Sequence, residues 1–310
     1  MTDIAKTVFE KYQVRKSKKQ KGAFIEYVKE TTSERGFECK IERGMLGAKN
    51  IIVGDPEHAK VVFTAHYDTC PRLPFPNFIT PENFLIYLLY QVTVLLLFFF
   101  LPFGVIGFLF GVLSGMLGIP AGVYSIFSLA LVTAFLWLLL AGPANKHTAN
   151  DNTSGVTTLL DIINELPEDL KSDAAFIFFD LEESGLFGSA GYASKHKQVM
   201  KNKLIINFDC VSDGSTILFA LRKKAKKYAP AIKKAFVSNE KFTVKAVSAG
   251  VFYPSDQMNF ALGVGVAALK TSKKFKILYM DRIHTDKDTV YSEENIRFLV
   301  DGSLSLIAAL

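Results

Sequence analysis

Histidine and carboxylate side chains recur along this chain at points where short apolar runs end. The set consists of His66, Asp68, Asp151, Glu182, Glu183, Asp209 and His284. In an open α/β sheet, ligands bind in the crevice beyond the carboxyl ends of the strands, so side chains at these positions would converge there. Two imidazoles with several carboxylates form a suitable ligand set for a pair of zinc-like divalent ions. We therefore expect a metal centre at one edge of a sheet.

The runs that precede these residues have the composition of buried strands, and patterns of helical period lie between them. We expect strands at residues 50–54, 61–66, 174–180, 204–209, 216–220, 242–247, 264–269 and 276–280. Helices are predicted at residues 22–32, 153–166, 188–200, 223–237 and 292–310. This alternation is typical of an α/β domain, in which helices cover both faces of a largely parallel sheet.

The composition divides the chain into charged and uncharged parts. Of 310 residues, 49% are hydrophobic, and residues 83–145 contain no Asp, Glu, Lys or Arg. All 66 charged side chains lie on the other 247 residues, and this share of about 27% is close to the ~25% of soluble domains. We predict one domain in two parts, residues 1–82 and 146–310, with a membrane segment inserted at residues 83–145. The composition excludes a disordered chain and a disulfide scaffold.

The uncharged segment is long enough for two membrane-spanning helices. Residues 84–101 are almost all apolar, apolar sequence continues past Pro102 to residue 117, and a second block covers residues 121–140. About 20 apolar residues cross a bilayer, so we predict two spans that contact lipid over residues 84–140, joined by a glycine-rich turn between residues 107 and 120. A third, shorter span would fit if Pro102 is a break. His66 precedes the insert, however, and Asp151 follows it. Because both residues must reach one site, the insert must contain an even number of spans unless one segment is re-entrant.

Charges and cysteines indicate the side of the membrane on which the domain lies. The predicted turn carries no charge, whereas Arg72 and Lys146 flank the insert, so the positive-inside bias places the charged domain in the cytoplasm. Cys39, Cys70 and Cys210 have no paired spacing, which fits free thiols in a reducing compartment. No signal peptide is expected at the N-terminus. We therefore expect a multi-pass protein of the cell membrane with its charged domain facing the cytoplasm.

Several short strings resemble a known family in their order along the chain. They are AHYDT (65–69), NDNTSGV (150–156), FDLEESGLFGS (179–189), NFD (207–209) and SDQMNF (255–260), followed by His284-Thr285 and Asp288-Thr289. In these strings the chain resembles the M28 family of zinc peptidases, over essentially all of its length except the insert. The resemblance implies an aminopeptidase-like hydrolase of peptides or small amides. It also implies a three-layer αβα sandwich around a mixed, mostly parallel sheet.

The same resemblance implies a role for each candidate residue. His66 and Glu183 would hold one zinc ion, Asp209 and His284 a second one, and Asp151 would bridge the two. Asp68 would orient His66 and raise its basicity. Glu182 would be the general base that takes a proton from water and delivers it to the leaving amine. Cobalt or manganese could replace zinc.

Some features depart from the family pattern or favour other functions. Gln257 stands where many relatives have histidine, so the substrate contacts of the family are not carried over to this position. Cys70 and Cys210 lie beside site residues and are interpreted as small buried side chains. One alternative is a single-zinc aminoacyltransferase like glutaminyl cyclases, and another is an inactive membrane scaffold that keeps the fold. The basic runs at residues 16–21 and 222–227 lie on no recognisable nucleic-acid module, so no nucleic-acid partner is expected. No oligomeric state is predicted.

Overall fold

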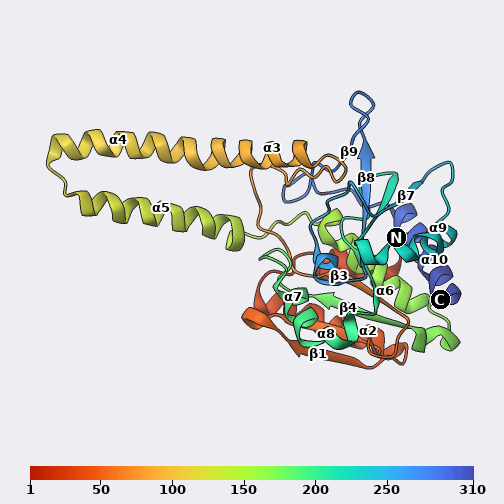
Figure 1. Cartoon of the computed structure of the whole chain (residues 1–310). Coiled ribbons are helices and arrows are strands. Elements are labelled where there is room, and N and C mark those ends of the chain that lie inside the picture. The colour runs from red at the N-terminus through yellow and green to blue at the C-terminus, as the bar shows by residue number, and fades with distance from the viewer.

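A layered α/β domain carries a hairpin of two long helices that projects away from it (Figure 1). The computed structural model describes residues 1–310, with the side chains of all of them except Phe99 and Ala121. The domain contains a mixed sheet with helices on both of its faces, so the predicted fold class is confirmed.

The sheet is built so that its central strands end at one edge. Its strands are β1 (Cys39–Arg43), β2 (Lys49–Val53), β3 (Val61–His66), β4 (Ala174–Phe179), β5 (Leu204–Phe208), β6 (Thr216–Leu221), β7 (Thr243–Val247), β8 (Gly263–Thr271) and β9 (Leu278–Tyr279). Their order is β1-β2-β4-β3-β5-β8-β6-β7, with β9 paired to β8. The neighbours β4, β3, β5 and β8 are parallel, whereas β2 and β6 join this group antiparallel. The residues that follow β3, β4 and β5 therefore lie side by side.

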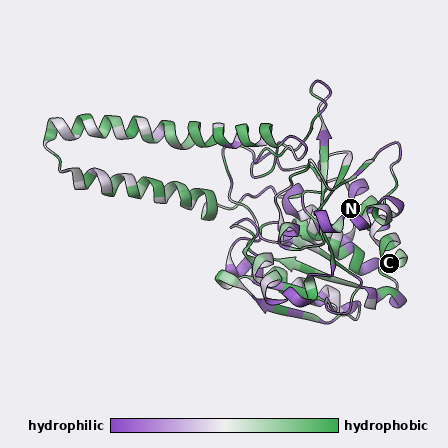
Figure 2. Cartoon of the chain, in the orientation of Figure 1, coloured by the Kyte–Doolittle hydropathy of each residue, from purple (hydrophilic) through white to green (hydrophobic). Residues whose placement is uncertain are grey.

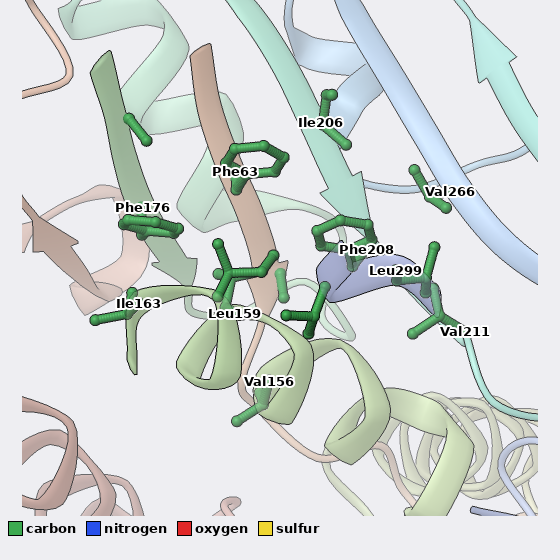
Figure 3. Packing of buried hydrophobic residues seen from close by; sticks show 14 of the residues in the cluster. Phe63, Val156, Leu159, Ile163, Phe176, Ile206, Phe208, Val211, Val266 and Leu299 are labelled. Carbon is green, nitrogen blue, oxygen red and sulfur yellow. The ribbon is translucent and has the colours of Figure 1, made fainter. Parts of the chain in front are cut away.

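Alternate residues of the central strands face the two helical layers, because side chains of a strand point to opposite faces in turn. Phe63 of β3 stacks between Phe176 of β4 and Phe208 of β5, with ring centroids 5.9 and 6.0 Å apart. Leu159 of the helix below belongs to the same core cluster (Figure 3). The neighbouring Val62 faces the opposite layer. Both faces of the central strands are apolar, as their sequences predict.

The two helical layers are unequal. One layer consists of α1 (Asp3–Lys11), α2 (Lys18–Glu34), α6 (Gly155–Glu165), α9 (Ala229–Ala235) and α10 (Glu293–Ala309). The other contains α7 (Phe187–Lys195) and α8 (Lys197–Met200). Short single turns complete the domain: η1 (Met45–Gly47), η3 (Ala149–Ser154), η4 (Glu168–Asp173), η5 (Lys223–Tyr228) and η6 (Asp256–Asn259). The sequence did not indicate α1 or β1, because α1 is short and the β1 sequence Cys-Lys-Ile-Glu-Arg is mostly polar.

The hairpin consists of two helices that are mostly hydrophobic along their length (Figure 2). The first runs without a break through α3 (Phe84–Leu95), the π-helical η2 (Leu96–Phe100) and α4 (Leu101–Leu117), and the second is α5 (Ala121–Ala141). Both are long and apolar enough to cross a membrane. The predicted turn between residues 107 and 120 is wrong in extent, since the helix continues to Leu117. Pro102, which has no N–H to donate, lies inside this continuous helix directly after the π-helical turn η2, and Gly118 ends the helix with φ 61°.

Candidate metal centre

The structure brings all seven predicted site residues to the carboxyl edge of the central strands. His66 is the last residue of β3, and Asp209 directly follows β5. Glu182 and Glu183 lie in the turn after β4, and Asp151 lies in η3 at the start of α6. His284 comes from the loop after β9, and Asp68 follows His66 by two residues. Three parallel strands and two loops therefore converge on one region.

Asp151 stands between the two histidines, with one carboxylate oxygen toward each. Its Oδ1 lies 3.2 Å from His66 Nε2, and its Oδ2 lies 3.3 Å from His284 Nε2. His66 Nε2 is also 3.6 Å from Asp209 Oδ1, while His284 Nε2 is 3.3 Å from Glu183 Oε2. The side chains thus form two groups that share Asp151, and the atoms within each group are close enough to hold one ion. His66, Glu182 and Glu183 form a third set of equally close atoms.

This grouping corrects one expectation from the sequence. Asp209 was expected beside His284, but the structure places it beside His66, and Glu183 lies next to His284. The reason lies in the order of the strands. Asp209 follows β5, which is the direct neighbour of the strand that ends in His66.

Asp68 connects His66 to the turn that carries both glutamates. Its Oδ1 accepts a hydrogen bond from the backbone N–H of Glu182 (3.0 Å), and its Oδ2 accepts one from Glu183 (3.3 Å). The same Oδ1 faces His66 Nδ1 at 3.6 Å. Burial acts to raise the pKa of Asp68, but its contacts with His66 outweigh burial and hold the pKa below the ordinary value. Asp68 is therefore a carboxylate that positions three other site residues.

The site contains more buried carboxylates than positive charge can balance. Burial raises the pKa of Glu182 and the pKa of Glu183 well above their ordinary values, and neighbouring carboxylates add to this effect. Burial also acts to raise the pKa of Asp151, but its contacts with His284 and His66 outweigh burial and hold this pKa below the ordinary value. Burial opposes a charge on His66, yet Glu182 and the other carboxylates raise the pKa of this imidazole. Such a cluster is costly unless a cation or protons neutralise it.

Divalent metal ions fit this donor set. Glu183 Oε1 and His66 Nδ1 are buried without a hydrogen-bond partner among the described residues. Imidazole nitrogens and carboxylate oxygens are the ligands that zinc accepts in proteins. The first group offers His66, Asp151 and Asp209, and the second offers His284, Asp151 and Glu183. Ions in these positions would partner the unsatisfied glutamate oxygen and offset the negative charge.

Two cysteines lie next to these groups. Cys210 donates to Asp209 Oδ1 at 3.1 Å, and Cys70 Sγ lies within 4.8 Å of the ligand atoms of the second group. Both cysteines are buried and unpaired. Burial raises the pKa of both thiols well above the ordinary value. They are small buried side chains, as the sequence suggests, and Cys70 also lies close to the candidate metal-binding atoms.

A second set of residues supports the site, and sequence reasoning gave none of them a role. Asp288 accepts hydrogen bonds from the backbone N–H groups of Asn150 (2.8 Å) and Asp151 (2.9 Å), so it holds the segment that carries the shared carboxylate. Burial raises the pKa of Asp288 to about 8. Tyr253 donates to the backbone oxygen of Asp209 at 2.9 Å. Asp288 belongs to a recognised string, which is a signal for its importance, whereas no sequence signal points to Tyr253.

Gln257, the position that departs from the family pattern, makes structural hydrogen bonds. Its Nε2 donates to the backbone oxygen of Tyr253 (2.6 Å), and its Oε1 accepts from Asn207 (3.3 Å). The side chain is buried, and it does not line the cavity at the metal centre. Glutamine at this position therefore affects the hydrogen bonds behind the site and does not alter the lining of the cavity.

A cavity of about 320 Å³ opens at the candidate metal centre. Both histidines and the carboxylates Asp151, Glu182, Glu183 and Asp209 form one part of its lining. The remainder is formed by Asn77, Ile79, Leu140, Ser184, Gly185, Cys210, Tyr253, Pro254 and Ile283. The cavity can therefore hold a small organic group directly against the candidate metal ligands.

Comparisons with known proteins agree with this geometry. Among solved structures, the chain is similar to a glutaminyl cyclase of Porphyromonas gingivalis, with a TM-score of 0.59, 15% identity, and 99% of this chain and 97% of the other covered. It is similar to a Zn-dependent exopeptidase of Parabacteroides distasonis (TM-score 0.58, 16% identity, coverage 98% and 94%). It also resembles the LapA aminopeptidase of Legionella pneumophila (TM-score 0.57, 10% identity, coverage 98% and 69%). At these identities the likeness shows a shared fold.

The search of curated proteins found no match. The family model described as peptidase family M28 matches residues 134–297, which is more than half of the chain and includes most of the candidate ligands. The chain belongs to peptidase family M28.

Proposed function

We propose that this protein is a membrane-anchored aminopeptidase that uses two zinc ions to remove N-terminal residues from peptides. The observation that carries the proposal is the position of Asp151, whose two oxygens face His66 at 3.2 Å and His284 at 3.3 Å. A carboxylate shared in this way is the natural bridge between two ions. His66 and Asp209 would complete the ligands of one ion, and His284 and Glu183 those of the other. Bound zinc supplies Lewis-acid polarisation of water and of the scissile carbonyl.

Glu182 is the residue proposed to move protons. It lines the cavity beside both metal groups, and its backbone N–H is held by Asp68 at 3.0 Å. Its carboxylate lies within 4.8 Å of the ligand atoms of His66 and Glu183, and Glu183 is the one of the two glutamates that reaches His284. Glu182 would accept a proton from the attacking water and return it to the leaving amine. The turn after β4 thus separates metal binding from proton transfer between two neighbouring glutamates.

The test is an assay of the full chain in detergent with aminoacyl-coumarin substrates. Glu182→Gln is expected to lower kcat by roughly 10²–10⁴-fold, the contribution typical of a general base, while two zinc ions stay bound. Glu38→Gln, at an exposed glutamate outside the site, is the matched control and should leave kcat unchanged. Activity that survives both the Glu182 change and removal of zinc by a chelator would overturn the mechanism.

A glutaminyl-cyclase-like reaction is the second candidate, because glutaminyl cyclases are among the similar solved structures. His284, Asp151 and Glu183 alone could hold the single ion that such a reaction needs. A peptide with N-terminal glutamine separates the two reactions. Loss of ammonia with the peptide intact, together with one zinc per chain, would favour the cyclase. Release of a free amino acid with two zinc ions favours the aminopeptidase. Zinc binding without any turnover would favour the inactive scaffold.

We also propose that the hairpin crosses the cell membrane twice and leaves the metal centre on the cytoplasmic side. The support is the length of the two helices, their lack of charge and the flanking Arg72 and Lys146. Reporter proteins placed at Gly118, in the turn of the hairpin, and after Leu310 test this topology. The turn reporter should be external and the terminal reporter cytoplasmic. Both reporters on the same side would contradict two spans.

A further inference from the structure

The base of the hairpin forms part of the cavity at the metal centre. Leu140, in the last turn of α5, lines the cavity together with Ile79 and Ile283. These three apolar side chains share one small space with the metal-binding side chains, which form its polar part. The segment that the sequence predicts to be a membrane anchor therefore also forms one wall of the proposed active site.

The chain that leads into the hairpin holds this apolar wall in place. We call residues 71–83 the entry strap. Leu73 N–H donates to the backbone oxygen of His284 (2.8 Å), and Asn77 N–H donates to that of Ile283 (3.2 Å). On its other side, the strap accepts hydrogen bonds from α3, since Tyr90 donates to Pro76 O (2.6 Å) and Gln91 donates to Asn77 Oδ1 (3.3 Å). The wall, the strap and the hairpin therefore form one connected unit.

The length of α5 places this wall at the surface of the bilayer. The span Gly122–Ala141 has 20 residues and is about 30 Å long, which equals the thickness of the hydrocarbon core. Leu140, next to its end, then lies at the boundary between lipid and water. The first helix of the hairpin has 34 residues, so it extends beyond the end of α5 along the domain. This extension exposes Leu85 (67%) and Leu89 (56%) and carries no charge, so apolar surface continues up to the domain.

We propose that Ile79, Leu140 and Ile283 form an apolar subsite for the first side chain of the substrate, and that the substrates are peptides with an apolar N-terminal residue held at the membrane surface. The proposal rests on the aminopeptidase function. A peptide whose N-terminal carbonyl lies at the metal centre must place its first side chain within the same cavity of about 320 Å³, next to these apolar groups. Apolar peptides also concentrate at a bilayer surface, and the position of Leu140 at the end of the α5 span brings this cavity close to that surface.

The first experiment compares leucyl and alanyl substrates with full-length protein in detergent. Leu140→Ala is expected to lower kcat/KM for the leucyl substrate by about 5–10-fold through KM, because part of an apolar wall is lost, and to change the alanyl value less than about twofold. Leu136→Ala is the matched control, since Leu136 lies one turn earlier in α5 and is 48% exposed against 51% for Leu140. No preference for leucyl over alanyl substrate in the wild type, or equal effects of Leu140→Ala on both, would overturn the subsite.

The second experiment tests delivery from the membrane. Protein reconstituted in phosphatidylcholine vesicles receives one leucyl peptide in two forms, with and without a C-terminal acyl chain. Faster cleavage of the acylated form is expected, and equal rates for the two forms would overturn the membrane part of the proposal.

Failure of the proposed reaction can be told apart from failure of the subsite by a binding measurement. Calorimetry with the Glu182→Gln variant records how tightly leucyl and alanyl peptides bind without turnover. Tighter binding of the leucyl peptide, lost in the Glu182→Gln, Leu140→Ala double variant, supports the subsite even if the wild type cleaves neither peptide. Equal binding of both peptides overturns the subsite whether or not the enzyme is active.

Discussion

Asp68→Asn is expected to weaken zinc binding although Asp68 is not itself a proposed ligand. Its two carboxylate oxygens accept from the backbone N–H groups of Glu182 and Glu183, at 3.0 and 3.3 Å. Asparagine keeps the size of the side chain but replaces one acceptor with an NH₂ group. One of the two N–H groups then loses its partner and faces another donor, so the turn that carries both glutamates must shift.

The size of this effect follows from the number and kind of bonds. A hydrogen bond to a charged group contributes about 1.5–3 kcal/mol. Loss of a residue that orients metal ligands typically weakens metal binding 10–100-fold, which corresponds to about 1.4–2.8 kcal/mol. The two estimates agree, so we expect a zinc Kd raised by roughly 30-fold. Because Asp68 also faces His66 Nδ1 at 3.6 Å, both ions should be affected.

The assay is a calorimetric titration of metal-stripped protein with zinc in the presence of a competing chelator. Asp169→Asn, at an exposed aspartate in η4, is the matched control and should bind zinc like the wild type. Circular dichroism should show that the variant keeps its secondary structure. A Kd within twofold of the wild-type value in a folded Asp68→Asn variant would refute the idea that this carboxylate positions the ligands.

Three further predictions concern the rest of the domain. Burial raises the pKa of Asp161 to about 6, so the stability it contributes is complete below about pH 4 and is lost as the pH rises through 6. Asp161→Asn should therefore raise the free energy of unfolding at pH 8 by up to about 3 kcal/mol and leave it unchanged at pH 4. The midpoint of thermal unfolding should rise accordingly at pH 8 only. Chelation of zinc should lower the same midpoint, because it leaves the carboxylates beside Asp151 unbalanced, and added zinc should restore it; an unchanged midpoint would contradict a metal centre. Phe63→Ala should cost about 3–5 kcal/mol of unfolding free energy, since Phe63 is fully buried between two phenylalanine rings, and a loss below 1 kcal/mol would contradict this packing.

The central strands and most of the site could be predicted from the sequence for one physical reason. Strands buried on both faces are continuous apolar runs, so the polar residues that end them are easy to recognise. The run that ends in His66 and the run before Asp209 are of this kind, and the structure has them as β3 and β5. The edge strand β1 has no such run, and it was missed.

The arrangement of the ligands could not be predicted, because it depends on which strands are neighbours. Sequence order does not show that β5 lies directly beside β3, which brings Asp209 to His66. His284 follows no long strand, and its position depends on a backbone hydrogen bond from Leu73 in the entry strap. The role of Leu140 in the cavity wall could not be predicted either, because the apolar sequence around it does not differ from the rest of the predicted span.

The way in which the hairpin joins the domain explains how a long insert can separate two residues of one site. The chain leaves the domain at Cys70 and returns at Asn145, whose N–H donates to the backbone oxygen of Cys70 at 3.0 Å. Arg72 N–H donates to Pro143 O at 2.8 Å, and Pro71 pairs with Ala144. These bonds hold the two ends together, so the length of the hairpin does not change the distance between His66 and Asp151. The entry strap adds a hydrogen bond to the backbone of His284, so the hairpin is connected to a proposed metal ligand. Replacing residues 84–141 with a short linker keeps these bonds between the two ends but removes Leu140 from the cavity and the α3 partners of the strap, so it should weaken zinc binding as well as leucyl preference. Zinc affinity equal to that of the full chain after this deletion would show that the hairpin and the metal centre are independent.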